Sequence, residues 1–228
     1  MSDGWGEFLL AFGVFLASHV LPARPGVKDR IVAMTGRAAY AAIYSTVSLV
    51  ILAWLIVAAG RAPFVPLWDM QGWHRWVVNL AMPAAILLAA CAVGAPNPLS
   101  FGGRADGFDP DRPGVAGVAR HPALWVLLIW AGAHLLVNGD LAHVILFGVF
   151  AGFSILGMWA LDKRHQRRLG ADWSRLAART SALPFAALIE GRWRPAGPLP
   201  VVRLGIGGAV WLLLLWLHLP VIGVPPLP

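Results

Sequence analysis

The sequence predicts an all-α fold, a single-domain polytopic membrane bundle of about six transmembrane helices over residues 1–228. Hydrophobic residues make up 58% of the chain and charged residues 13%, whereas soluble domains carry roughly 25% charged residues. Apolar runs of about 20 residues, the length that crosses the hydrocarbon core of a bilayer, recur along the chain. The charges gather between these runs, so lipid is the solvent that suits this composition.

Each apolar run is bounded by residues that end or begin helices. Pro22 follows the first run, Gly60 follows the second, and Pro122 suits the first turn of the fourth, where a missing N–H is tolerated. A tight turn at residues 138–140 separates the fourth run from the fifth. The acidic flank of the first run and the lack of a small-residue cleavage site indicate a retained helix. We expect transmembrane helices over residues 5–21, 38–59, 76–93, 121–137, 141–161 and 201–221.

Basic residues are distributed asymmetrically around these helices. The net charge is +7, and 16 of the 18 Lys and Arg residues fall in three alternate connections, within residues 24–37, 104–120 and 163–203. Cytoplasmic loops carry such an excess, so we expect these connections in the cytoplasm and both termini outside it. The position of the charges between apolar runs excludes nucleic acid as a partner. Residues 163–179 alternate basic and apolar side chains, which predicts an amphipathic helix on the membrane surface with anionic lipid as its partner.

Two of the seven histidines, His19 and His134, lie inside apolar runs. A histidine in hydrocarbon is costly and usually faces the bundle interior. There a neutral imidazole either ligates haem iron or forms a hydrogen bond with a neighbouring helix. Trp130, His134 and Asn138 stand four residues apart and share one helix face. This stripe orients the imidazole, lines a pocket, or packs against another helix.

The other histidines stand near helix ends or between helices. His121 lies in an Arg-His-Pro sequence at the head of the fourth helix, where it either caps the helix or serves a functional site. His143 and His218 mark helix ends, and we expect His74 and His165 in loops that contact water. The single cysteine excludes an intrachain disulfide. The sequence contains no phosphate-binding glycine loop, zinc motif or serine nucleophile elbow.

Several short strings stand in a specific order. They are His19, residues 65–68 (Val-Pro-Leu-Trp), 120–122 (Arg-His-Pro), 129–134, 138–140 (Asn-Gly-Asp) and 179–192 (RTSALPFAALIEGR). This arrangement resembles the NnrU family, which includes the 15-cis-zeta-carotene isomerases of plants and cyanobacteria. The resemblance implies a haem b protein of the bacterial inner membrane, whose histidine-held iron converts a cis double bond of a carotenoid to trans. It implies His19 and His134 as iron ligands, with His121, Trp130 and Asn138 beside the cofactor.

The chain departs from the plant isomerases at two places. Ala131 stands where they carry a cysteine, and residues 152–153 read Gly-Phe where they carry a His-His pair. Ligand exchange through that cysteine is therefore impossible, and lipophilic polyenes other than carotenoids are open as substrates. The predicted topology puts His19 toward the cytoplasm and His134 toward the outside, about 20 Å along the fourth helix from His121. The alternative ligand pairs are His19 with His121, and His134 with His143 or His218.

Two further function classes fit the sequence. Bacterial members of the family are linked to nitrite and nitric oxide metabolism, which implies a non-catalytic haem or nitric oxide sensor, or an accessory protein. The Arg-His-Pro string and the basic residues 168–173 also resemble membrane methyltransferases that use S-adenosylmethionine. The paired glutamates of those enzymes are missing, and only Asp162 with Lys163 stands at that position.

Overall fold

The computed structural model describes residues 3–22 and 24–227, and it confirms the all-α prediction for them. The longer helices are α1 (Asp3–Val20), α2 (Pro25–Thr35), α3 (Arg37–Arg61), α4 (Gly72–Ala92), α6 (Pro122–Val137), α7 (Leu141–Leu169) and α10 (Val201–Ile222). The short helices are α5 (Val115–Val118), α8 (Ala171–Ala177) and α9 (Ala186–Ile189).

Four helices, α3, α4, α7 and α10, are long and apolar enough to cross a membrane. At most 22% of the apolar window of each is buried inside the protein, so most of these side chains face outward. Outward apolar side chains on this scale suit lipid rather than water. The chain is therefore a membrane protein. Two shorter apolar helices, α1 and α6, occupy the other predicted spans, and their crossing of the bilayer stays a prediction.

The connections differ from the sequence prediction in two places. Helix α2 occupies part of the connection between the first two predicted spans, where the sequence analysis identified no helix. Helix α7 continues to Leu169 instead of ending at Leu161, because its charged residues are good helix formers and basic side chains suit a helix C-terminus. Gly170, at φ +53°, separates it from α8. The prediction of one amphipathic helix over residues 163–179 is therefore wrong. This segment consists of the end of α7 followed by α8.

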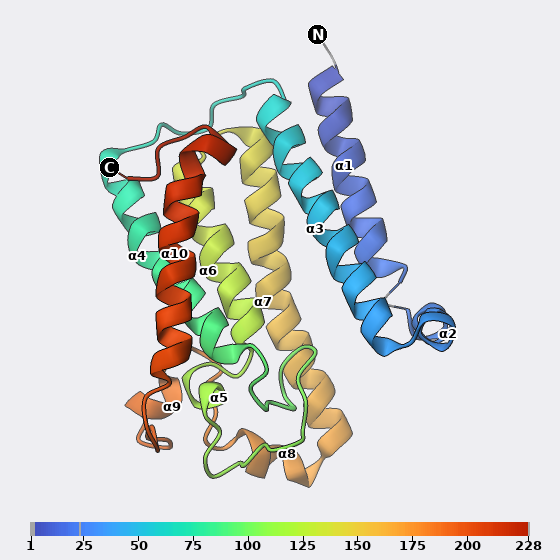
Figure 1. Ribbon diagram of the computed structural model, residues 1–228, viewed down its shortest axis with the longest axis vertical. Coiled ribbons are helices and arrows are strands. Elements are labelled where there is room, and N and C mark those ends of the chain that lie inside the picture. The colour runs from blue at the N-terminus through green and yellow to red at the C-terminus, as the bar shows by residue number, and fades with distance from the viewer. Residues whose placement is uncertain (1–2, 23, 228) are drawn as a thin grey trace. The chain divides into compact units, whose positions relative to one another are not determined.

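The chain divides into two compact units, one of which comprises residues up to Asp69 and Gly139–Leu146. In this unit α1 lies beside α3 (Figure 1). Glu7 joins the two helices, because its carboxylate accepts from Trp54 Nε1 at 3.2 Å and pairs with Arg61 at 3.3 Å. The turn at Gly139 meets the chain after α3: Leu67 N–H donates to Gly139 O at 2.7 Å, and Leu141 N–H donates to Val65 O at 2.9 Å.

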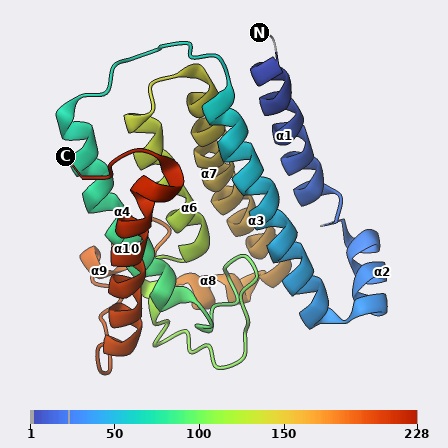
Figure 2. The same cartoon turned by 45° about the horizontal axis from the view of Figure 1, so that its top comes forward.

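The second unit comprises Met70–Asn138 and Phe147–Pro228. Helix α4 packs against both α6 and α10. The short helices α5, α8 and α9 lie at the end of the unit where α4 ends and α6 and α10 begin (Figure 1), and Figure 2 gives a second view of α8 and α9. Arg203 at the start of α10 closes this end of α4 by donating to Cys91 O at 2.8 Å and Val93 O at 2.7 Å. Two of the three basic connections thus share one end of this unit. The prediction of a single domain stays a prediction.

Replacing Gly139 with alanine is expected to destabilise the first unit. A Cβ atom there would lie 1.9 Å from Trp68 O, so the turn must move and its bonds to the chain after α3 weaken. Overpacking of this kind costs about 1–3 kcal/mol. Thermal unfolding in detergent, followed by tryptophan fluorescence, measures the loss. Gly132→Ala in α6 is the control, because an added Cβ there meets no atom within 4 Å apart from the adjacent backbone of its own helix. Equal melting temperatures for the two variants would contradict the expectation.

Candidate functional site

His19 lies near the end of α1, in the first unit. Its Nδ1 is 2.8 Å from Phe15 O and 3.3 Å from Ser18 Oγ. The imidazole packs against the Phe15 ring at 4.1 Å and meets the edge of Tyr44 at 5.8 Å. A carbonyl accepts only, so Nδ1 carries the proton and Nε2 keeps its lone pair.

His134 repeats this geometry in α6 of the second unit. Its Nδ1 donates to Trp130 O at 2.9 Å, and Asn138 Nδ2 donates to His134 O at 2.7 Å. The ring lies 5.6 Å from Trp130 and 5.4 Å from Phe147. The polar stripe on α6 is therefore a hydrogen-bonded series that fixes the orientation of the imidazole. Its contact with a cofactor stays a prediction.

The shared Nδ1 bond gives both histidines the form of a metal-binding imidazole. Metal-ligating histidines almost always donate their second ring nitrogen to a carbonyl or carboxylate, which fixes the tautomer. Among the described residues, no group of three or more His, Cys, Asp or Glu is suited to a metal ion. Haem needs only one or two axial protein ligands, so His19 and His134 fit haem better than a bare ion. They belong to different units of the chain.

His121 has a different environment, because its Nε2 lies 2.9 Å from Asp162 Oδ1. Arg120 Nη1 donates to the second oxygen of Asp162 at 2.6 Å, and Arg120 Nε donates to Thr180 Oγ1 at 2.7 Å. The guanidinium carbon of Arg120 lies 5.0 Å from the Trp173 ring. The His121 side chain is 1% exposed, and its Nδ1 has no hydrogen-bond partner among the described residues. Burial lowers the pKa of the Arg120 guanidinium, and the neighbouring Asp162 carboxylate acts against this shift.

The string 179–192 forms the wall behind this cluster. Ser181 Oγ donates to Gly117 O at 2.5 Å and accepts from Ala187 N–H at 2.8 Å. Arg120 N–H donates to Ser181 O at 2.7 Å, and Asn97 Nδ2 donates to Arg120 O at 2.9 Å. The sequence analysis noted Asp162 after a long apolar run, but no pattern linked it to Arg120 or Thr180.

The remaining histidines also form local hydrogen bonds, and His218 shares the Nδ1–carbonyl geometry of His19 and His134. His143 Nδ1 lies 2.7 Å from Asp140 Oδ2 at the start of α7, and His218 Nδ1 lies 2.7 Å from Val224 O at the end of α10. The expectation that His74 and His165 lie in water-exposed loops is wrong. Both are buried on helices, at 5% and 7% exposure. His74 accepts from Gln71 N–H in a capping box, and the His165 ring stacks on Trp173.

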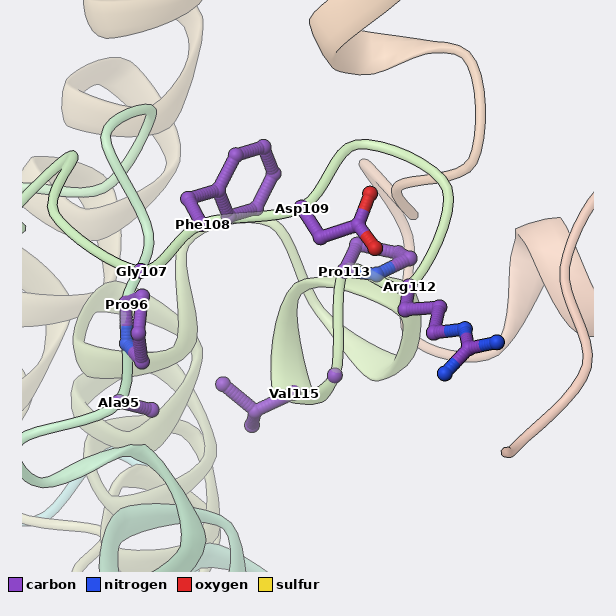
Figure 3. A pocket seen from close by; sticks show the side chains of 9 residues that line it. Ala95, Pro96, Gly107, Phe108, Asp109, Arg112, Pro113 and Val115 are labelled. Atoms are coloured by element: carbon purple, nitrogen blue, oxygen red, sulfur yellow. The ribbon is translucent and has the colours of Figure 1, made fainter. Parts of the chain in front are cut away.

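Two cavities open beside the connection between α4 and α6. Pro96, Phe108 and Val115 line the smaller one, of about 80 Å³, and the Arg112 guanidinium extends away from them (Figure 3). The larger, about 370 Å³, lies between the end of α4, residues 94–104 and the first turns of α6. Small-molecule sites measure roughly 300–1,000 Å³, so only the larger reaches that size. Neither cavity is lined by His19, His121 or His134.

Comparison with protein families matches residues 7–226 to the family described as NnrU protein. The chain belongs to the NnrU family. The match covers nearly the whole chain, both units included, and confirms the resemblance drawn from the ordered strings. No solved structure matches the chain.

Two curated relatives of this NnrU-family chain are similar over a shorter stretch. The chain is 35% identical over 80 residues to the 15-cis-zeta-carotene isomerase, chloroplastic, of Arabidopsis thaliana, covering 35% of the chain and 22% of that protein. It is 35% identical over 79 residues to the protein of the same name from Zea mays, with the same shares. The match thus spans about a fifth of the length of these relatives.

Proposed function

We propose that this chain binds haem b in the membrane and isomerises a cis double bond of a lipophilic polyene, such as a carotenoid. Family membership and two relatives named as carotene isomerases support the reaction class. The observation that carries the haem proposal is the Nδ1–carbonyl bond at both His19 and His134, which leaves each Nε2 free for iron.

In this proposal His19 and His134 are the candidate ligands that would hold the iron of haem b, and the haem would supply the redox-controlled reactivity. The Trp130 carbonyl keeps the His134 proton on Nδ1, and Asn138 bonds the last turn of α6 so that the ring is held in place. Phe147 and Trp130 surround the ring with apolar surface, which excludes water and suits a hydrocarbon substrate. The Nε2 of His121 faces Asp162 instead, so we assign His121 to the polar cluster rather than to iron.

We also propose the membrane orientation. The end of the second unit that holds α5, α8 and α9 carries residues 104–120 and 163–203, which are rich in arginine. The positive-inside rule puts this end in the cytoplasm. With α1 and α6 as spans, six crossings follow, and both termini lie outside.

The test is to purify the protein in mild detergent after expression with supplied haem. We expect a Soret band, and sharper visible bands after dithionite reduction. Incubation with 15-cis-zeta-carotene should give the trans product, resolved by chromatography, only when the iron is reduced. Absence of a Soret band despite haem supply would refute haem binding. Haem that binds nitric oxide but turns over no polyene would instead indicate the sensor function.

A further inference from the structure

Residues Leu183–Ile189, the apolar loop, present large hydrophobic side chains outward although they belong to no membrane-spanning helix. Leu183 is 66% exposed, Phe185 50% and Ile189 82%. Exposed apolar side chains on spanning helices face lipid, but this loop lies between α8 and α10. A contiguous apolar display of this kind marks a surface for a membrane or a partner.

The apolar loop is firmly held in its outward position. Phe185 N–H donates to Val118 O at 2.8 Å, and Trp125 Nε1 donates to Ala182 O at 2.9 Å. Behind it, Ala187 is fully buried. Phe185 has φ +64°, and no other non-glycine residue described in the chain has a positive φ. A bulky side chain in the left-handed region is strained and persists only where its surroundings hold it. The outward position of these apolar side chains is therefore fixed by contacts with the rest of the second unit, and the loop is not a frayed segment.

The segment that contains the apolar loop is strongly basic. Residues 163–194 contain eight Lys and Arg residues against two acids, for a net charge of +6. Arg192 contacts the residues on either side of the loop, donating to Thr180 O at 3.1 Å and pairing with Glu190 at 2.5 Å. Arg194 is exposed. A bilayer surface rich in anionic lipid complements this charge, because each basic residue near it contributes favourable energy.

The position of the loop matches the bilayer boundary. In Figure 1 α9 lies at the end of the second unit where α10 begins, and α10 is long and apolar enough to span the membrane from Val201. Apolar side chains at this level reach the region between headgroups and acyl chains, where interfacial segments bury their apolar faces.

We propose that the apolar loop is an interfacial anchor that inserts into the headgroup–acyl boundary of an anionic leaflet, while the basic residues of 163–194 contact lipid phosphates. This anchor fixes the depth of the polar cluster at Asp162, whose wall is the same string of residues.

Site-directed fluorescence tests the anchor in the full-length protein. In a Cys91→Ser background, Ile189→Cys and Ser174→Cys are each labelled with an environment-sensitive dye and reconstituted into nanodiscs. Ser174 is the matched control, because it is exposed on α8 outside the apolar loop. Lipids brominated in the acyl chain should quench the dye at 189 several-fold more than at 174, and aqueous iodide should do the reverse. Adding phosphatidylglycerol to phosphatidylcholine nanodiscs should shift the emission at 189 further to the blue.

Three outcomes would overturn the proposal. Equal iodide quenching at 189 and 174 would show that the apolar loop stays in water. Protection of position 189 from both quenchers would indicate a protein partner, such as a second copy of the chain. Insertion that ignores phosphatidylglycerol would exclude recognition of anionic lipid. Leu183→Cys provides a second position within the loop if Ile189→Cys fails to fold.

Discussion

Replacing His134 with alanine is expected to lower the haem content of the purified protein at least about tenfold, since even outer partners of metal ligands change affinity by 10–100-fold. The substitution removes the imidazole whose Nδ1 is bonded to Trp130 O and whose Nε2 is directed to the iron in our proposal. The ratio of Soret absorbance to protein absorbance, taken on the monodisperse fraction, measures the loss. His19→Ala should give the same direction of change.

His121→Ala is the matched comparison for this experiment. His121 is a buried histidine at the opposite end of the same helix, where it caps the start of α6, but its Nε2 faces Asp162, so folded His121→Ala protein should retain its haem. The His218→Ala variant tests the alternative ligand pair of His134 with His218. If His218→Ala loses haem while His19→Ala retains it, the iron is held by His134 and His218. Full haem retention by His134→Ala would refute His134 as a ligand.

Local patterns in the sequence were sufficient to predict the apolar helices. Hydrophobic length alone placed α3, α4 and α10 within a few residues of their ends and located the start of α7, because a bilayer demands long apolar runs. It missed α2, whose composition is mixed and whose length suits no span. It also ended α7 too early, because a change from apolar to charged residues marks the edge of lipid but does not end a helix.

The sequence likewise predicted part of the candidate site and missed the rest. His19 and His134 could be singled out because polar residues in apolar runs are rare, and the i to i+4 spacing of Trp130, His134 and Asn138 predicts their hydrogen bonds. The cluster of Arg120, Asp162 and Thr180 could not be predicted. Asp162 and Thr180 lie 42 and 60 positions from Arg120 in the sequence. Local periodicity in the sequence does not indicate contacts between residues that are so far apart along the chain.

Replacing Asp162 with alanine is expected to lower the free energy of unfolding by about 3 kcal/mol or more, because removal of one partner strands a buried charge. Asp162 pairs with Arg120 at 2.6 Å, and the Arg120 side chain is 10% exposed. It also holds the fully buried His121 ring. Thermal unfolding or titration with a denaturing detergent measures the change. Asp172→Asn, on an exposed position of α8, is the control and should change stability by no more than about 0.5 kcal/mol.

The cause of the Asp162 effect can be isolated in a double-mutant cycle. In an Arg120→Met background the stranded guanidinium is gone, so Asp162→Ala should cost at least about 1 kcal/mol less than in the native chain. An equal cost in both backgrounds would trace the loss to His121 or to packing instead. Haem content provides an independent readout, and folded Asp162→Ala protein should keep its Soret band. The cluster of Arg120, Asp162 and Thr180 supports the fold at the basic end of the helices, whereas His134 lies 13 residues further along the chain than His121. A stable Asp162→Ala protein that loses haem would instead join the polar cluster to the cofactor site.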